Sequence, residues 1–219
     1  VGLLLGWHYP VAGQLLIDDE PLDYERLQRL RNETAWVDTT IQLWNRSFLY
    51  NLRYGGGQVP LNLVIEEADL RTVLERLPEG MQTRLGGEGR LISGGEGQRA
   101  RLARGMQRQD ARLVILDEPF RGLDREKRRT LLARARAYWP AATLICITHD
   151  VGQTQSFERV LVIDNGRIVE DGAPAELLAR PTSRYKTLME AEDAVREKLW
   201  ANEAWRRLWL ENGHVRETG

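Results

Sequence analysis

The sequence contains a single cysteine, Cys146, among its 219 residues. No disulfide can therefore form within the chain, and a metal site built from several cysteines is excluded. Cys146 lies inside the apolar run "TLICIT", which predicts a thiol packed in a core. A chain that uses cysteine so sparingly fits a reducing compartment.

Long apolar runs are also missing. The longest ones, such as residues 1–7 and 143–147, are far shorter than the roughly 20 residues that a membrane-spanning helix needs. The first six residues are too few for a secretory signal peptide and lack its charged start. We therefore expect neither a membrane helix nor a signal peptide within these residues.

Neither sign of charge dominates the chain. The formal net charge of −1 gives no bulk electrostatic reason to expect nucleic-acid binding. Lysine is rare, however, since only three of the 31 basic residues are lysines. Arginine favours bidentate partners such as phosphate and carboxylate. Solvated helix faces explain the same bias equally well.

The chain is long enough for one domain, or for one domain with an extension. Residues 1–55 mix short strand-like runs with turns. Residues 56–110 are predicted to be helical, because "LNLVIEEADLRTVLERLP" repeats apolar residues every three or four positions. Residues 111–172 alternate strand, helix, strand and hairpin, so the sequence predicts an α/β fold.

The last of these regions predicts a strand–helix–strand unit. Its strands are expected at 113–117 and 142–150, with a helix over 125–139 between them. Asn165-Gly166 marks the tip of a two-residue hairpin further on. Two parallel strands joined by a helix usually lie side by side, so both strands should end at the same edge of the sheet.

Three chemically active side chains follow these two strands. Asp117 and Glu118 come directly after the first, and His149 comes after the second. Open α/β sheets bind their ligands at this carboxyl edge, so the sequence predicts a functional site there. An ordinary solvated loop edge explains the same polar residues about as well.

A glycine-rich helix start precedes the first strand. Ser93 and Glu96 form the S-x-x-E pattern of a capping box. Gly94 and Gly95, inside the box, leave the backbone N–H groups unshielded. A helix N-terminus with bare amides binds anions, most often phosphate. A plain helix start is common for a lone capping box but rarely contains two glycines.

The stretch "ISGGEGQRARLARGMQRQDARLVILDEPFRGLD" resembles the signature, Walker B and D-loop block of ABC-family ATPases, and "ITHD" resembles their switch-histidine loop. The similarity covers about the first 180 residues. "TRLGGEGRLISGGE" is similar to the segment that touches the membrane domain in exporters of this family. The resemblance implies an α/β, P-loop NTPase-like core with a mostly parallel sheet, a helical subdomain and a C-terminal helical tail.

The resemblance also assigns roles to single residues. Asp117 would hold a water on Mg²⁺, Glu118 would polarise the attacking water, and His149 would contact the γ-phosphate of ATP. The other expected nucleotide-site residues bind a nucleotide held by a second ABC ATPase domain in a head-to-tail dimer, or organise the contact with that domain. They are Ser93, Gly94, Gly95, Glu96 and Asp124.

The chain departs from the family pattern in three places. It has no Gly-Lys pair, so the phosphate-binding Walker A loop G-x-x-x-x-G-K-[ST] is absent. We expect that loop upstream of a truncated start; a degenerate subunit is the alternative. The resemblance implies a glutamine after the strand "TAWV" that contacts metal and water and senses the membrane domain; here Thr39 stands in that place, with Gln42 three residues on, and both are candidate nucleotide-site residues. Glu96 stands where glutamine is usual and adds a negative charge near phosphate.

These features predict two parts, an ATPase domain over 1–180 with its helical subdomain at about 56–110, and a helical extension over 181–219. The apolar residues of the extension first share one helical face, and those after Ala201 lie on a different face. They are Leu188, Met189, Val195 and Leu199, followed by Trp205 and Leu208. Docking on its own domain explains this helix better than partner binding.

The leading interpretation is the ATP-hydrolysing domain of a membrane exporter, working with ATP and Mg²⁺ at the cytoplasmic face of a membrane. Its expected partners are a second ATPase domain and a transmembrane domain, with no direct nucleic acid. Two alternatives remain. One is a soluble ABC ATPase acting on nucleic acid or ribosomes, which usually has a longer insertion than residues 56–90 allow. The other is a catalytically silent domain that lends its signature loop to an intact partner.

Overall fold

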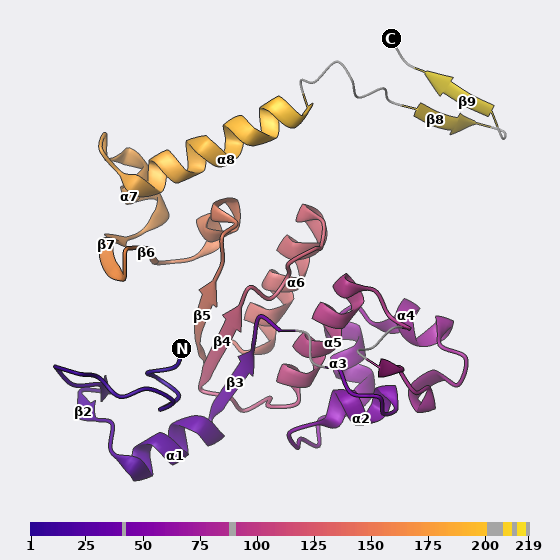
Figure 1. The fold of residues 1–219 in the computed structure, drawn as a ribbon, viewed down its shortest axis with the longest axis horizontal. Helices are drawn as coiled ribbons and strands as arrows, with labels where there is room; N and C mark the ends of the chain where they lie inside the picture. The colour runs from indigo at the N-terminus through magenta and orange to yellow at the C-terminus, as the bar shows by residue number, and fades with distance from the viewer. Residues whose placement is uncertain (41–42, 88–90, 201–207, 212–213, 218–219) are drawn as a thin grey trace. The chain divides into compact units, whose positions relative to one another are not determined.

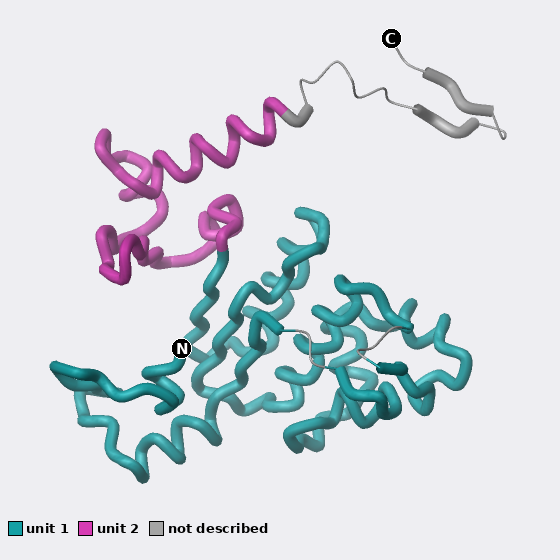
Figure 2. The backbone as a smooth tube through the Cα atoms, in the orientation of Figure 1, with its two compact units in different colours: residues 1–148 teal, residues 149–219 magenta. Residues whose placement is uncertain are grey.

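A computed structural model describes residues 1–40, 43–87, 91–200, 208–211 and 214–217. It divides the chain into two compact units, residues 1–148 and 149–219 (Figure 2). Within the described residues, no helix has both the length and the apolar character needed to cross a membrane. The predicted division at residue 180 follows the family resemblance and stays a prediction.

The first unit is built on a three-stranded parallel sheet (Figure 1). Its strands, in the order β3-β4-β5, are β3 (Thr34–Val37), β4 (Leu113–Asp117) and β5 (Thr143–Ile147). The four apolar residues of β4 are buried, as their place in the middle of the sheet requires. Helix α6 (Arg125–Tyr138) joins β4 to β5, which confirms the predicted strand–helix–strand unit.

A small hairpin and a helix precede this sheet. The hairpin pairs β1 (Leu16–Ile17) with β2 (Glu20–Pro21), and α1 (Tyr24–Asn32) follows. The carboxylate of Asp23 caps α1 by accepting the backbone N–H of Arg26 at 2.9 Å.

The helical region consists of α2 (Phe48–Arg53), α3 (Leu61–Glu67), α4 (Arg71–Arg76), the 3₁₀ turn η1 (Gly80–Gln82) and α5 (Gly94–Met106). The apolar repeat that predicted continuous helix is interrupted at Asp69, whose φ of 55° is left-handed. Arg99 and Lys127 both pair with the Asp69 carboxylate, at 2.9 and 3.1 Å. These charges on α5 and α6 stabilise the corner between α3 and α4.

Helix α5 packs closely against the end of β3. A Cβ added at Gly105 would lie 2.9 Å from Cγ2 of Val37, so only glycine allows this approach without a shift of Val37. Two aromatic residues at the end of α6 bind the C-terminal end of α5 and the residues after it: the hydroxyl of Tyr138 donates to the carbonyl of Met106, and the indole N–H of Trp139 donates to the carbonyl of Arg108. Helix α5 is therefore fixed to the sheet near its C-terminus.

The second unit contains the 3₁₀ turn η3 (Val151–Ser156), β6 (Val160–Asp164), β7 (Arg167–Gly172), α7 (Pro174–Ala179) and α8 (Arg184–Trp200). Asn165 and Gly166 have φ values of 48° and 74°, which confirms the predicted two-residue turn between β6 and β7. Its core joins the hairpin and both helices through Val162, Leu177, Tyr185 and Met189.

A carboxylate on β7 caps the last helix of this core. Glu170 accepts the backbone N–H groups of Arg184 and Tyr185 at 2.9 and 2.8 Å. Burial by itself raises the pKa of Glu170, but these N–H groups and the hydroxyl of Ser183 outweigh it and lower the pKa. The ionised carboxylate therefore satisfies helix N–H groups that would otherwise lack a partner.

The prediction of a helical tail up to residue 219 is wrong for the end of the chain. A helical tail is confirmed as far as Trp200, but β8 (Leu208–Glu211) and β9 (His214–Glu217) form an antiparallel hairpin instead of more helix. The Asn-Gly dipeptide at 212–213 is the strongest short hairpin signal in a sequence, and the helical prediction overlooked it. Trp205 lies outside the described residues.

Candidate functional site

The paired carboxylates lie at the carboxyl end of the central strand. Asp117 is the last residue of β4 and pairs in register with Ile147 of β5. The N–H of Glu118 extends the ladder by donating to the carbonyl of Ile147 at 2.9 Å. Glu118 has a φ of 46°, an uncommon left-handed conformation for a residue with a side chain. Such local strain is typical of functional sites, and here it lies on the predicted general base.

The cysteine beside these carboxylates is not reactive. Cys146 pairs in register with Leu116 and is half-buried. Burial, followed by the negative charges of Glu118 and Asp117, raises the pKa of the Cys146 thiol to about 12. The thiol therefore stays protonated at neutral pH, in agreement with the predicted packing role.

His149 follows β5 by two residues, and β5 ends beside Asp117. It is the first residue of the second unit. The strand order therefore agrees with the expected edge, while the approach of the His149 ring to Glu118 stays a prediction.

The capping box at the start of α5 is confirmed. The Ser93 hydroxyl accepts the N–H of Glu96 at 3.3 Å, and the Glu96 carboxylate accepts the N–H of Ser93 at 2.7 Å. A Cβ added at Gly94 would meet nothing within 4 Å, so this glycine leaves the helix start open. A Cβ added at Gly95 would lie only 2.6 Å from Cδ2 of Leu123. The second glycine thus makes room for the loop that follows β4.

The negative charge of Glu96 is compensated within the same unit. A guanidinium nitrogen of Arg76, at the end of α4, lies 2.7 Å from the Glu96 carboxylate. Burial by itself raises the pKa of Glu96, but the Ser93 N–H and Arg76 outweigh burial and lower it. Sequence analysis missed Arg76, because nothing in the pattern connects two residues 20 positions apart.

Asp124 begins helix α6. Its carboxylate accepts the N–H of Lys127 at 2.8 Å, and this hydrogen bond lowers the pKa of Asp124. The structure therefore gives Asp124 a capping role within its own chain. Its expected role in the contact with a second domain stays a prediction.

Thr39 stands at the position where the family pattern has a glutamine. Thr39 follows β3 by two residues, and Gln42 lies outside the described residues. The neighbouring Asp38 forms an ion pair with Arg101 of α5, at 2.7 Å. Sequence analysis did not single out either partner of this pair.

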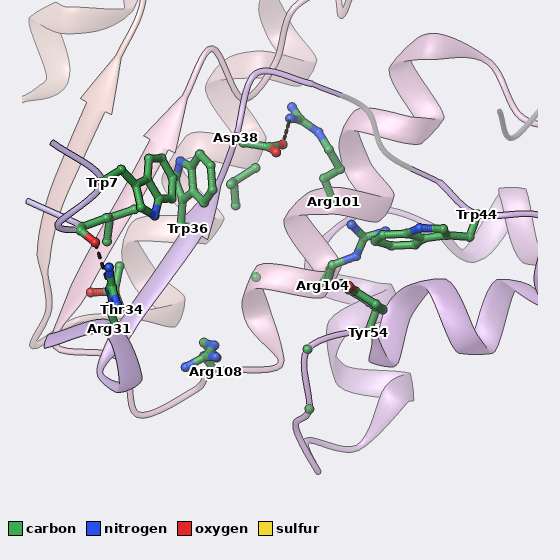
Figure 3. A pocket seen from close by; sticks show the side chains of 15 residues that line it. Trp7, Arg31, Thr34, Trp36, Asp38, Trp44, Tyr54, Arg101, Arg104 and Arg108 are labelled. Carbon is green, nitrogen blue, oxygen red and sulfur yellow. Dashed lines mark hydrogen bonds and ion pairs between the residues drawn. The ribbon is translucent and has the colours of Figure 1, made fainter. Parts of the chain in front are cut away.

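A pocket of about 460 Å³ opens between the N-terminal segment, β3, helix α5 and the segments that flank α2 (Figure 3). Its walls carry three tryptophans, one tyrosine, four arginines and one carboxylate: Trp7, Trp36, Trp44, Tyr54, Arg31, Arg101, Arg104, Arg108 and Asp38. Two pairs of these side chains are in contact: the rings of Trp7 and Trp36 have centroids 4.7 Å apart in a tilted arrangement, and the Arg104 guanidinium lies 4.8 Å from the centre of the Trp44 ring. Burial lowers the pKa of Arg104 to about 10, so it remains a cation at neutral pH.

The acidic residues fit a metal that phosphates help to hold. Within the described ranges, no group of three or more His, Cys, Asp or Glu side chains could hold a metal ion on its own. Mg²⁺ is usually bound by one or two carboxylates together with substrate phosphates and water. Asp117, on a half-buried strand end beside Glu118, suits that arrangement.

Comparison with known proteins gives a consistent result. Residues 1–121 match the family model described as ABC transporter. An ATP-dependent lipid A-core flippase of Xylella fastidiosa (strain 9a5c) is 34% identical over 184 residues, which are 82% of this chain and 31% of that protein. The flippase of Ralstonia nicotianae is 33% identical over 186 residues, with the same coverage.

The solved structures agree. The chain superposes on a bacterial Atm1-family ABC exporter with ATP bound, with a TM-score of 0.81 and 27% identity, over 88% of this chain and 34% of that one. The chain thus spans about a third of the length of the relatives that it matches. The chain belongs to the ABC transporter family and has the fold of an exporter-type nucleotide-binding domain.

Proposed function

We propose that this chain is the part of an ABC exporter that binds and hydrolyses ATP, at the cytoplasmic face of a membrane. The observation that carries the proposal is the carboxylate pair Asp117–Glu118 at the end of the buried β4, with a strained backbone at Glu118. The relatives are named ATP-dependent flippases and the similar structure is an exporter, which supports the same activity.

In this proposal the two carboxylates have different roles. Mg²⁺ held through Asp117 supplies positive charge that offsets the negative charge of the phosphates. Glu118 orients the attacking water and accepts its proton, a contribution of about 10²- to 10⁴-fold to the rate. His149 contacts the γ-phosphate. β4 ends at Asp117 and the backbone of Glu118 is left-handed, so the two neighbouring carboxylates need not serve the same ligand.

The helix start at Ser93 serves a second nucleotide. Its open Gly94 and the N-terminal N–H groups of α5 suit the γ-phosphate of an ATP held by another ATPase domain in a head-to-tail dimer. The Arg76–Glu96 pair supports this role, because it offsets the negative charge that Glu96 brings to the site. Asp124 then lies next to the domain interface.

The phosphate loop comes from a segment outside residues 1–219 in this proposal. Within the described strands, β5 pairs only with β4, so its outer edge has no partner. Parallel strands seldom remain at an edge without cover. We infer that the strand carrying the phosphate loop pairs with this edge of β5 and completes an ATPase domain that ends near residue 180.

The membrane domain is the second proposed partner. The pocket in Figure 3 borders the end of β3, the position where family members use a glutamine to sense that domain. Its tryptophans and arginines suit a segment with an apolar side chain and a carboxylate. We therefore place the contact with the transmembrane domain at this pocket.

The silent-domain alternative is tested together with the main proposal. In the complete protein, Glu118→Gln is expected to keep nucleotide affinity and lower phosphate release at least about 100-fold. Glu75→Gln, on the exposed face of α4, is the matched control and is expected to stay within twofold of the wild type. If the Glu118→Gln variant releases phosphate at the wild-type rate, Glu118 is not the general base, and the catalytically silent domain is favoured.

A further inference from the structure

The segment that leaves β3 is bound to helix α5 by one buried guanidinium. The side chain of Arg101 is only 2% exposed, and a terminal nitrogen of it lies 2.7 Å from the carboxylate of Asp38. Figure 3 marks this contact with a dashed line. The same nitrogen donates to the carbonyl of Thr40 at 3.2 Å. Arg101 thus holds both neighbours of Thr39, the residue that replaces the family's glutamine.

The other atoms of Arg101 keep it in place. Its second terminal nitrogen donates to the side-chain oxygen of Gln98, one turn earlier in α5. Its Nε is buried and has no hydrogen-bond partner in the described part of the chain. A buried charge with an unsatisfied N–H persists only where its remaining contacts are strong.

Helix α5 and the end of β3 are joined at a second point on the same face. Gly105, one helical turn after Arg101, lies against Val37, the last residue of β3. Val37 in turn pairs with Leu116, the neighbour of Asp117. Packed contacts therefore connect α5, which begins at the Ser93 capping box, with the carboxyl edge of the sheet.

We propose that Asp38 and Arg101 form a clamp that positions Thr39 at the end of β3 and couples it to α5, in place of the missing glutamine. This inference rests on the proposed ATPase function, and Arg101 acts in it as a positioning residue without touching the nucleotide. Coupling of this kind is typically about 5- to 150-fold.

The chain contains a matched control for the clamp. Arg99 of α5 and Asp69 form a second ion pair with a buried guanidinium, at 2.9 Å, with side-chain exposures of 7% and 38% against 2% and 30% for Arg101 and Asp38. This second pair binds the corner between α3 and α4 and does not touch the segment after β3. Asp38→Asn and Asp69→Asn each leave one buried guanidinium without its carboxylate, and Asp69→Asn also removes the partner of Lys127, so the control variant loses at least as much stability as the clamp variant.

The first test is hydrogen–deuterium exchange in the complete protein. Asp38→Asn is expected to raise exchange at least about tenfold in residues 36–40, while Asp69→Asn raises it only around 66–72. Asp38→Asn combined with Arg101→Met removes the uncompensated charge and keeps the fold available if the single variant is unstable. Unchanged exchange in 36–40 in both Asp38 variants would overturn the clamp.

The second test is steady-state ATP hydrolysis by the same variants. Asp38→Asn and the double variant are expected to lower kcat about 5- to 150-fold with the KM for ATP within twofold, whereas Asp69→Asn leaves kcat within twofold. Asp38→Glu should recover part of kcat. Equal losses in the Asp38 and Asp69 variants would mean a purely structural pair. Failure of the ATPase proposal is recognised separately, by a Glu118→Gln variant that still turns over.

Discussion

A methyl group added at Gly95 should disturb function far more than stability. In Gly95→Ala the new Cβ would lie 2.6 Å from Cδ2 of Leu123, where ordinary contacts begin at 3.4 Å. The Leu123 side chain must therefore move by about 0.8 Å or change rotamer. A shift of this kind costs about 0.5–1.5 kcal/mol.

Alanine also stabilises the helix that begins there. Gly95 is the second residue of α5, and replacing glycine by alanine within a helix gains up to about 1 kcal/mol. The two effects nearly cancel, so the free energy of unfolding should change by less than about 1 kcal/mol. For a chain of this length the melting temperature then shifts by no more than about 2–4 °C.

The functional effect is expected to be larger because Leu123 precedes Asp124 directly. A misplacement of about 1 Å near an active site can lower the rate about 100-fold. We therefore expect Gly95→Ala to reduce ATP hydrolysis in the complete protein by about 10- to 100-fold. The assay is steady-state phosphate release, measured beside thermal unfolding of the same samples.

A second substitution separates this mechanism from simple crowding of the nucleotide. Leu123→Ala removes the δ carbons and should restore part of the activity of Gly95→Ala. Gly94→Ala, whose Cβ would meet nothing within 4 Å of its own chain, should not be rescued by Leu123→Ala. The reasoning is refuted if Leu123→Ala changes both glycine variants by the same factor, since residues in contact should be non-additive by more than about 0.5 kcal/mol.

Three further outcomes are expected. Glu96→Gln should lower the melting temperature at pH 7, because it removes the ion pair with Arg76. Folding lowers the pKa of Glu96, so the stabilisation by this pair is present above the unfolded pKa of about 4.5 and is lost as the pH falls through the folded pKa. The difference in stability between variant and wild type should therefore vanish in unfolding curves measured in acid. Glu170→Ala should uncap α8 and cost about 1 kcal/mol, measured by denaturant unfolding; an unchanged midpoint would contradict the capping role. Residues 1–219 alone should bind ATP with a Kd well above the micromolar range in titration calorimetry, because the phosphate loop is absent; micromolar binding would reveal another phosphate site.

Local patterns predicted the elements that carry the proposed chemistry. The apolar run before Asp117 could be recognised as a central strand because β4 is buried on both faces. The capping box at Ser93 and the turn at Asn165-Gly166 were also predicted, since their geometry depends only on residues within four positions of each other. In these places the local sequence preference and the fold agree.

Contacts between distant segments could not be predicted in the same way. Asp69 lies in an uninterrupted helical pattern, yet the structure ends α3 just before it, and cations from α5 and α6 pair with its carboxylate. Arg101 looked like one arginine of many, yet it is buried against Asp38, 63 positions away. Such pairs depend on how helices cross, which hydrophobic periodicity does not specify.

The open edge of β5 has a practical consequence for handling the chain. The strand Thr143–Ile147 contains no charge and no proline, the residues with which proteins usually protect an edge. Since no described strand pairs with its outer edge, the N–H and C=O groups there can recruit a complementary strand, including the same strand of another copy. Residues 1–219 produced in isolation should form aggregates that grow with concentration, and a peptide supplying the partner strand should act as a cap that keeps the chain monomeric. Under the proposed function this edge is suited to fragment complementation, in which recovery of ATP binding reports the pairing of two separately made pieces.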